Sequence, residues 1–229
     1  MTLSSKRTGH LIVTIDGPAG AGKSTVAKGL AKQLGLSYLD TGAMYRALTL
    51  KALAKKVSLE DEQALVNLAR HTDIDLEGSA EQLKVILDGK DVSEAIRTPD
   101  VTNKTYHISQ APRVREIMVE WQRAMGKRKG IVIEGRDTGT VVFPSASFKF
   151  YLDADLNVRS TRRTKELQEK GQSVDAAKMK EDIKTRDHKD MTREASPLKK
   201  ADDAVFIDTT HLTIEQTVER ILEHIKAHG

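Results

Sequence analysis

Along the chain, short apolar runs alternate with longer stretches in which apolar and polar residues recur at helical spacing. The runs are brief and rich in Ile, Val, Leu or Phe, as strands covered on both faces are expected to be. They occupy residues 11–16, 37–39, 130–134, 147–152 and 204–208. Because helical patterns lie between them, this order predicts parallel strands joined by crossover helices. We therefore expect an α/β fold of the P-loop NTPase type, with a five-stranded parallel sheet and helices on both faces.

Local signals mark where three of the helices begin or end. Apolar residues recur every four positions over residues 23–34, and Gly35 follows as a C-terminal stop. Pro112 is typical of the first turn of a helix, where no backbone N–H is needed. Thr213 and Gln216 have the spacing of a capping box before the last helix.

Two segments interrupt the alternation of strands and helices. Residues 83–87 predict a strand, and Asp88-Gly89 is a strong signal for a hairpin turn. Residues 73–93 are therefore expected to form a small antiparallel insertion outside the main sheet. The second segment, residues 155–200, is predicted to be a highly charged pair of helices broken at Gly171.

Composition narrows the classes of function. With 229 residues, 38% of them apolar and 31% charged, the chain fits one globular domain at residues 11–229 behind a loose tail at residues 1–10. The formal net charge is only +4 and the basic runs are short, so we expect no nucleic-acid partner. The absence of cysteine excludes disulfides and zinc–cysteine sites. No stretch reaches the roughly 18 apolar residues of a membrane span. The first ten residues lack the apolar core of a secretion signal. We expect a monomeric, cytoplasmic protein without a membrane partner.

A glycine-rich sequence lies between the first predicted strand and the first predicted helix. It matches the pattern G-x-x-x-x-G-K-[ST] in full. Its glycines let backbone N–H groups converge on an anion at a helix N-terminus. Lys23 is expected to bridge the β- and γ-phosphates of ATP, and the Ser24 hydroxyl to coordinate Mg²⁺. The residues expected to bind ATP here are Gly17, Pro18, Ala19, Gly20, Ala21, Gly22, Lys23, Ser24 and Thr25. GTPases, motors and kinases share this motif, so other residues must distinguish them.

Two loops that follow predicted strands carry groups suited to an anionic acceptor. Ligands bind at the carboxyl ends of the strands in open parallel sheets. Thr41 and Arg46 follow the second strand, although Thr41 could instead cap the next helix and Arg46 could be a surface charge. Arg136 and Asp137 follow the third strand between two glycines, which permit the unusual backbone angles that concentrate at functional turns.

A charged stripe runs along the second helix of the charged pair. Its members are spaced by four and three residues, beginning apolar and becoming charged: Met179, Ile183, Arg186, Asp190 and Arg193. Charges on a core-facing stripe are costly unless an anion or a partner charge meets them. We therefore expect Arg186 and Arg193 to enter a nucleotide cleft; the alternative is a helix that leaves the core and becomes solvated. Arg159, Arg162 and Arg163 form a similar cluster, of which at least one is expected to lie only at the surface.

Taken together, these elements resemble the cytidylate kinase family, and the match runs from about residue 11 to the last helix. Besides the glycine-rich loop, the resemblance is carried by residues 40–46, 112–115, 134–144 and 186–198. The insertion at residues 73–93 is similar to the extended acceptor-binding domain of the bacterial form. The resemblance implies an acceptor-binding insertion at about residues 40–112 and a helical lid at about residues 155–197.

The resemblance also implies a reaction and a set of roles. ATP, with Mg²⁺, would donate its γ-phosphoryl group to CMP or dCMP, giving ADP and CDP or dCDP. Arg159, Arg162 and Arg163 would belong to a mobile lid over ATP, and Arg115 and Asp137 would read the cytosine edge. The residues implied to hold the ribose and phosphate of CMP are Thr41, Tyr45, Arg46, Arg136, Arg186, Asp190 and Arg193. Because phosphoryl transfer is mostly positioning and charge neutralisation, catalysis would rest on Lys23, Arg136, Arg186 and Arg193.

One position departs from the family pattern. The family usually has a serine near the base, six residues before the proline of the Pro-x-Val-Arg element, and this chain has Tyr106 there. We include Tyr106 among the CMP-binding residues, with its hydroxyl replacing that of serine in a reshaped base pocket.

Two other functions compete with this interpretation. A P-loop kinase acting on an alcohol such as shikimate or gluconate would need a carboxylate base, and Asp16 or Glu134 could serve. The surplus of arginines favours a phosphorylated acceptor instead. The second alternative is a nucleotide-dependent switch, but the chain has no Asn-Lys-x-Asp guanine signature, and a switch would leave the acceptor-side arginines without a role.

Overall fold

The computed structural model describes residues 11–80, 82–128, 130–169, 171 and 173–229, and the expected loose tail at residues 1–10 lies outside them. The main sheet has five strands in the order β2-β6-β1-β7-β8. Their bounds are Ile12–Asp16 for β1, Ser37–Asp40 for β2, Ile131–Gly135 for β6, Phe148–Asp153 for β7 and Val205–Asp208 for β8. Every strand expected from the apolar runs is present, and no end is shifted by more than one residue.

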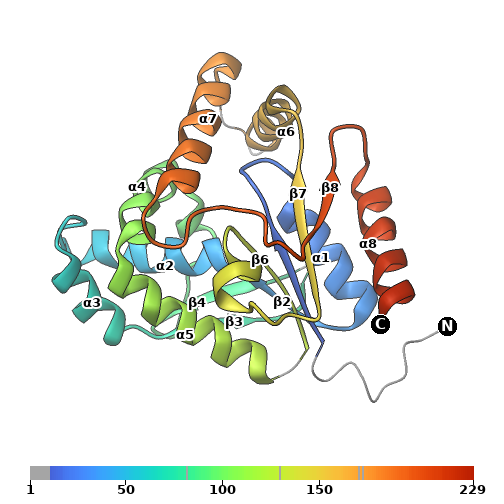
Figure 1. Ribbon diagram of the computed structural model, residues 1–229. Helices are drawn as coiled ribbons and strands as arrows, with labels where there is room; N and C mark the ends of the chain where they lie inside the picture. The colour runs from blue at the N-terminus through green and yellow to red at the C-terminus, as the bar shows by residue number, and fades with distance from the viewer. Residues whose placement is uncertain (1–10, 81, 129, 170, 172) are drawn as a thin grey trace. The chain divides into compact units, whose positions relative to one another are not determined.

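The strands β1, β7 and β8 run side by side (Figure 1). β1 pairs in parallel with β7, with Asp16 opposite Tyr151, and β7 pairs in parallel with β8. Val13 and Ile15 of β1 are fully buried, as expected of a strand covered on both faces. The predicted five-stranded parallel sheet is confirmed.

The chain divides into two compact units, one containing Ala31–Ile133 and the other Ile12–Leu30 with Glu134–Gly229. In the first unit, α2 packs against α4 and α3 packs against α5. The helices of this unit are α2 (Thr41–Ala54), α3 (Glu62–Arg70), η2 (Ala95–Arg97), α4 (Pro99–Gln110) and α5 (Pro112–Arg128). Pro112 occupies the first turn of α5, as predicted.

A small antiparallel sheet belongs to the first unit. Its strands, in the order β3-β4-β5, are Ile74–Glu77, Lys84–Leu87 and Lys90–Asp91. Asp88 and Gly89 join β4 to β5 with φ angles of 48° and 78°, the left-handed backbone that the Asp-Gly signal predicted. Lys51 of α2 holds this turn, because its ammonium group lies 2.6 Å from Asp88 Oδ2. The predicted hairpin is therefore present, and β3 extends it to three strands.

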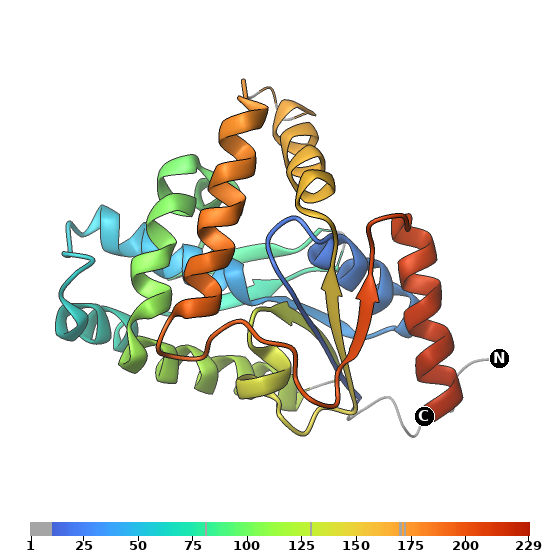
Figure 2. The ribbon, with the colours of Figure 1, turned by 45° about the horizontal axis from the view of Figure 1, so that its top comes forward.

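The strand β1 leads into α1 (Lys23–Leu34), and β6 leads into the short π-helical turn η3 (Thr138–Val142). The charged pair of helices is present as α6 (Leu156–Glu169) and α7 (Ala176–Thr192), which run side by side (Figures 1 and 2). The last helix, α8 (Ile214–His228), begins at the predicted capping box, in which the side chains of Thr213 and Gln216 each accept a hydrogen bond from the other residue's backbone N–H. Within the described ranges, no helix is both long and apolar enough to cross a membrane.

Candidate active site

The glycine-rich loop joins β1 to α1 in the second unit, and its shape depends on residues without a side chain. Gly17, Gly20 and Gly22 have φ angles of 146°, 78° and 87°, in the region that favours glycine. A Cβ atom on Gly17 would lie 1.9 Å from the carbonyl oxygen of Leu152 in β7. One on Gly20 would lie 2.8 Å from the carbonyl oxygen of Arg159 in α6. The loop therefore packs closely against both neighbouring elements.

Lys23, the first residue of α1, is buried, and its Nζ donates a 2.7 Å hydrogen bond to the carbonyl oxygen of Pro18. Burial and the positive charge of Arg136 lower the pKa of Lys23 to about 7. Arg186 lowers the pKa further, while the negative charge of Glu134 opposes the shift. Two arginines therefore act electrostatically on the loop lysine within one compact unit. A group of cations like this favours a multiply charged anion.

Two carboxylates lie beside the loop and are engaged by hydrogen bonds. The Ser24 hydroxyl donates a 2.6 Å hydrogen bond to Glu134 Oε1. Asp16 accepts hydrogen bonds from the Thr138 and Gly139 amides, at 2.9 and 2.7 Å, and from the Thr138 hydroxyl at 2.8 Å. Burial raises the pKa of Asp16 to about 6, although these hydrogen bonds oppose the shift. Asp16 thus ties the end of β1 to η3, which is a structural role and not that of a free base.

The oxygens around Ser24 suit Mg²⁺, which prefers hard oxygen ligands and retains several of its waters. The Ser24 hydroxyl and the Glu134 carboxylate supply such oxygens 2.6 Å apart. Among the described residues, no group of three or more His, Cys, Asp or Glu side chains is placed to hold a metal ion by itself. This donor set fits a cation that is held mainly by the phosphates of its nucleotide.

Arginines and aspartates after β6 and on α7 form a second cluster in the same unit. Arg136 Nε lies 2.8 Å from Asp190 Oδ2. The buried Arg193 donates from Nε to the carbonyl oxygen of Ser196 at 2.7 Å, and its Nη2 lies 3.6 Å from Asp137 Oδ1. Burial alone would raise the pKa of Asp190, but the charges of Arg136 and other arginines outweigh it and hold the pKa below its ordinary value. The structure therefore brings together four of the predicted acceptor-side residues.

The stripe on α7 differs from the one expected. Ile183, Asp187 and Asp190 are its buried residues, whereas the side chain of Arg186 is exposed. The expected stripe therefore does not keep one direction at Arg186: the helix turns the residue four positions after Ile183 inward, and not the residue three positions after it. The entry of Arg186 into a nucleotide cleft stays a prediction. Arg186 is nevertheless close enough for its charge to lower the pKa values of both Lys23 and Asp190.

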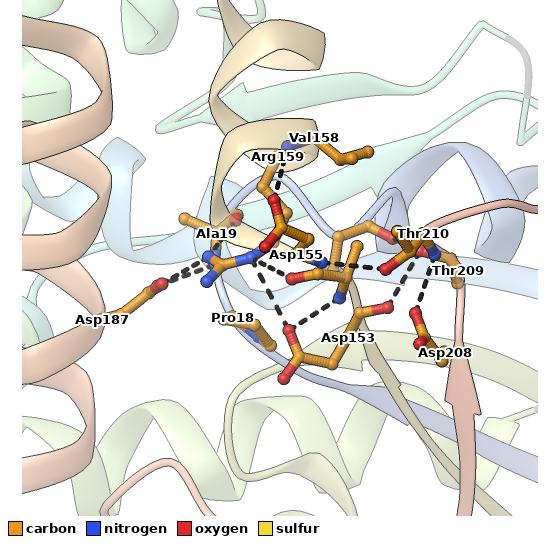
Figure 3. A network of polar contacts seen from close by, with 12 residues as sticks. Pro18, Ala19, Asp153, Asp155, Val158, Arg159, Asp187, Asp208, Thr209 and Thr210 are labelled. Carbon is orange, nitrogen blue, oxygen red and sulfur yellow. Dashed lines mark hydrogen bonds and ion pairs between the residues drawn. The ribbon is translucent and has the colours of Figure 1, made fainter. Parts of the chain in front are cut away.

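Asp187 is the functional candidate that the sequence reasoning missed. It accepts a 3.0 Å hydrogen bond from the Ala19 N–H in the glycine-rich loop and forms an ion pair with Arg159 (Figure 3). Arg159 also donates a 2.9 Å hydrogen bond to the Ala19 carbonyl oxygen. The spacing of Ile183, Asp187 and Asp190 fits a helix as well as the predicted stripe through Arg186 does. Considering this second stripe would have pointed to Asp187.

The other two arginines of α6 have different surroundings. Arg162 donates to the carbonyl oxygen of Thr209 at 2.6 Å and to its hydroxyl at 3.1 Å. Arg163 forms a 2.6 Å ion pair with Glu166, one turn away on the same helix, and both side chains are about one-third or more exposed. Of the three arginines, only Arg159 directly contacts the glycine-rich loop through a hydrogen bond that the structure records.

In the first unit, the start of α2 carries a second group of predicted residues. Asp40 is the N-cap: it accepts a 2.8 Å hydrogen bond from the Ala43 amide, so Thr41 is not needed as the cap. Arg46 donates to Asp40 at 2.9 Å. Burial would raise the pKa of Asp40, but the charge of Arg46, the Ala43 hydrogen bond and the charge of Arg97 together lower it.

Three further residues predicted to bind CMP, Tyr45, Tyr106 and Arg115, lie on α2, α4 and α5 of the same unit. The Arg115 guanidinium lies 5.4 Å from the centre of the Tyr45 ring, and both residues are buried. Arg115 also donates a 3.0 Å hydrogen bond to the carbonyl oxygen of Ser109. Tyr106 is half-buried on α4, with its ring edge-on to that of His107 at 6.0 Å.

The strand, glycine-rich loop, helix and buried lysine define a P-loop nucleotide-binding protein of the α/β class. A family model described as cytidylate kinase matches residues 13–227. A cytidylate kinase of Caldanaerobacter subterraneus subsp. tengcongensis is 53% identical over 214 residues, covering 93% of this chain and 94% of that protein. A cytidylate kinase of Geobacillus sp. (strain WCH70) is 50% identical over 214 residues, covering 93% and 96%. The chain therefore belongs to the cytidylate kinase family, which confirms the resemblance found in the sequence.

Among solved structures, an uncharacterized protein from Eubacterium ventriosum ATCC 27560 aligns over 95% of this chain and 99% of its own. The TM-score is 0.53 and the sequence identity 13%, so this similarity concerns the fold alone.

Proposed function

We propose that this protein transfers the γ-phosphoryl group of ATP to CMP and dCMP, giving ADP and CDP or dCDP. The observation that carries the proposal is the electrostatic neighbourhood of Lys23, whose pKa is lowered by burial and by Arg136 and Arg186. Bringing three cations together is unfavourable unless anions bind among them. A donor triphosphate and an acceptor phosphate supply such anions, and membership of the cytidylate kinase family identifies the acceptor.

On the donor side, the proposal assigns ATP to the loop residues Gly17 to Thr25 and to the arginines of α6, Arg159, Arg162 and Arg163. The backbone N–H groups of a loop at a helix N-terminus are suited to phosphate oxygens. Ser24 would hold Mg²⁺ together with the nucleotide. When bound, Mg²⁺ offsets negative charge on the β- and γ-phosphates.

On the acceptor side, two groups of residues would serve CMP. The proposed CMP-binding residues are Thr41, Tyr45, Arg46, Tyr106, Arg115, Arg136, Asp137, Arg186, Asp190 and Arg193. Lys23, Arg136, Arg186 and Arg193 would offset the charge that develops on the transferring group. The acceptor phosphate is already an anion, so the reaction requires no strong base, in keeping with the engagement of Asp16 by three hydrogen-bond donors.

The proposal extends to the organisation of the chain. Residues at about 40–112 would form the acceptor-binding insertion, which includes the three-stranded sheet, and residues at about 155–197 would form the lid, which includes α6 and α7. We propose a monomeric, cytoplasmic enzyme that uses neither nucleic acid nor a membrane.

ADP formation from ATP, measured against a panel of acceptors, tests the proposal. The panel contains CMP, dCMP, UMP, AMP, GMP, shikimate and gluconate, with Lys23→Ala as the inactive control. We expect turnover with CMP and dCMP, and loss of turnover in Lys23→Ala without loss of the circular dichroism signal. Preferred turnover of shikimate or gluconate would support the alcohol kinase instead. Equal ADP formation with and without acceptor would support a nucleotide switch.

A further inference from the structure

Asp187 of α7 is a buried carboxylate with no part in the substrate contacts proposed above. Its Oδ1 accepts a 3.0 Å hydrogen bond from the Ala19 N–H, and its other oxygen pairs with the Arg159 guanidinium (Figure 3). A carboxylate so close to a phosphate-binding loop is unfavourable for anion binding unless its charge is offset. Arg159 provides that offset, so the pair can contact the loop without excess negative charge.

Arg159 contacts the same loop residue from the first turns of α6. Its Nη1 donates a 2.9 Å hydrogen bond to the Ala19 carbonyl oxygen, while its Nε donates to the Ala154 carbonyl oxygen at 2.9 Å. Asp187 and Arg159 thus bind both polar backbone groups of Ala19. The following residue, Gly20, packs against the backbone of Arg159 so closely that a Cβ would lie 2.8 Å from its carbonyl oxygen. The first half of the loop is therefore fixed by side chains that lie more than a hundred residues later in the sequence.

The position of Asp187 on α7 links this contact to the arginine cluster. Residues three apart on a helix lie on the same face. Asp190, three residues later, is 2.8 Å from Arg136. One face of α7 therefore carries two acids, one bound to the glycine-rich loop and one bound to a proposed acceptor-side arginine.

We propose that Asp187 is a positioning residue for the donor site. Acting through Ala19 and Arg159, it holds the loop in the shape that lets the later N–H groups, from Gly20 to Ser24, converge on phosphate. Both oxygens of Asp187 are engaged, one by the Ala19 N–H and the other by Arg159, so the carboxylate acts on the loop and not directly on the nucleotide. The proposal rests on the proposed function, because it concerns the ATP site of that reaction.

Calorimetric titration of ADP into the complete chain without acceptor tests this role. Asp187→Ala removes both contacts, and Asp187→Asn keeps an oxygen for the Ala19 N–H but removes the charge that pairs with Arg159. Asp182→Asn, an exposed acid on the same helix, is the matched control. We expect ADP to bind about 10- to 100-fold more weakly to Asp187→Ala, with Asp187→Asn intermediate and the control unchanged, because charge-assisted hydrogen bonds are the stronger ones.

Steady-state kinetics separate positioning from general damage to α7. The KM for ATP should rise with the Kd for ADP, while the KM for CMP stays within about threefold of wild type. An equal rise in both KM values would overturn the proposal, as would ADP binding to Asp187→Ala within about threefold of wild type. If Asp187→Ala fails to fold, Asp187→Asn carries the same comparison. If the proposed acceptor is wrong, the ADP-formation assay with different acceptors will show it, and the results of the ADP titrations will be unaffected.

Discussion

The ammonium group of Lys23 donates a 2.7 Å hydrogen bond to the carbonyl oxygen of Pro18, five residues earlier in the same loop. The Lys23 side chain thus folds back over the glycine-rich loop and bonds to its backbone. Because the group is buried and Arg136 adds a repulsive charge, its pKa is lowered to about 7, against an ordinary value of 10.5. In the free protein, the pKa of Lys23 is therefore close to neutral pH. A bound phosphate is expected to favour the protonated form.

We expect ADP binding at pH 8 to be accompanied by proton uptake. Since the pKa of Lys23 is about 7, the Lys23 side chain is mostly neutral at that pH. Phosphate oxygens favour the charged form and raise the pKa, so up to about one proton should be taken up per ADP. Titrations in two buffers of different ionisation enthalpy measure this number directly.

Lys23→Arg is the control for the proton-uptake prediction, because arginine stays protonated in proteins and cannot take up a proton on binding. Uptake in the arginine variant equal to that in wild type would assign the proton to another group. Wild-type uptake below about 0.2 proton would contradict a neutral Lys23 in the free protein.

The strands were predictable from the sequence because buried parallel strands form continuous apolar runs, and those runs survive as β1, β2, β6, β7 and β8. The short strand β3 was not identified as a separate strand. Of its four residues only Ile74 is buried, so its local pattern is too weak to distinguish it from a loop. β3 is fixed by its pairing with β4, in which Ile74 lies opposite Leu87, and that contact is made across an intervening loop.

The site was predictable where residue type alone dictates the chemistry, as in the glycine-rich loop. The site was not predictable on α7, where two different sets of residues fit the spacing of one helix face equally well. Starting from Ile183, a helical repeat reaches Arg186 after three residues and Asp187 after four, and both steps are allowed. Which of the two residues faces inward depends on Ala19 and Arg159, which contact Asp187 from distant parts of the chain.

We expect a glycine exchange in the loop to be far more damaging than one at a helix end. In Gly17→Ala the new Cβ would lie 1.9 Å from the carbonyl oxygen of Leu152, so the loop or β7 must move. Gly35 also has a positive φ, 66°, but nothing lies within 4 Å of its Cβ position. Gly35→Ala should cost about 1 kcal/mol of unfolding free energy, and Gly17→Ala more than about 3 kcal/mol. Urea denaturation measures both, and equal losses would contradict the close packing of the loop on β7.

Arg186→Ala and Arg193→Ala should both lower kcat/KM for CMP, by about one to two orders of magnitude, because each would lose the charge-assisted contacts that we propose it makes with the acceptor. Their stabilities should differ. Arg186 is exposed, so its removal should change the unfolding free energy by no more than about 0.5 kcal/mol. Arg193 is buried and donates to Ser196, so its removal should cost about 1–3 kcal/mol. Kinetics with parallel thermal unfolding check the pair; an Arg186→Ala variant with normal kinetics would remove that residue from the site.

Discrimination between cytosine and uracil is expected to depend on Asp137, a buried carboxylate 3.6 Å from Arg193. Cytosine presents an amine at C4, from which a carboxylate oxygen can accept a hydrogen bond, whereas uracil presents a carbonyl oxygen, which a carboxylate oxygen repels. A buried polar mismatch costs about 1–3 kcal/mol, so CMP and dCMP should exceed UMP in kcat/KM by roughly 10- to 100-fold. Asp137→Asn should narrow the ratio, because an amide N–H can donate to the uracil carbonyl. Tyr106→Ser should widen it, because the exchange restores the residue that the family usually has at this position of the base pocket. Kinetics of CMP and UMP for the three proteins test this; equal rates in wild type with no change in Asp137→Asn would place the base-reading group elsewhere.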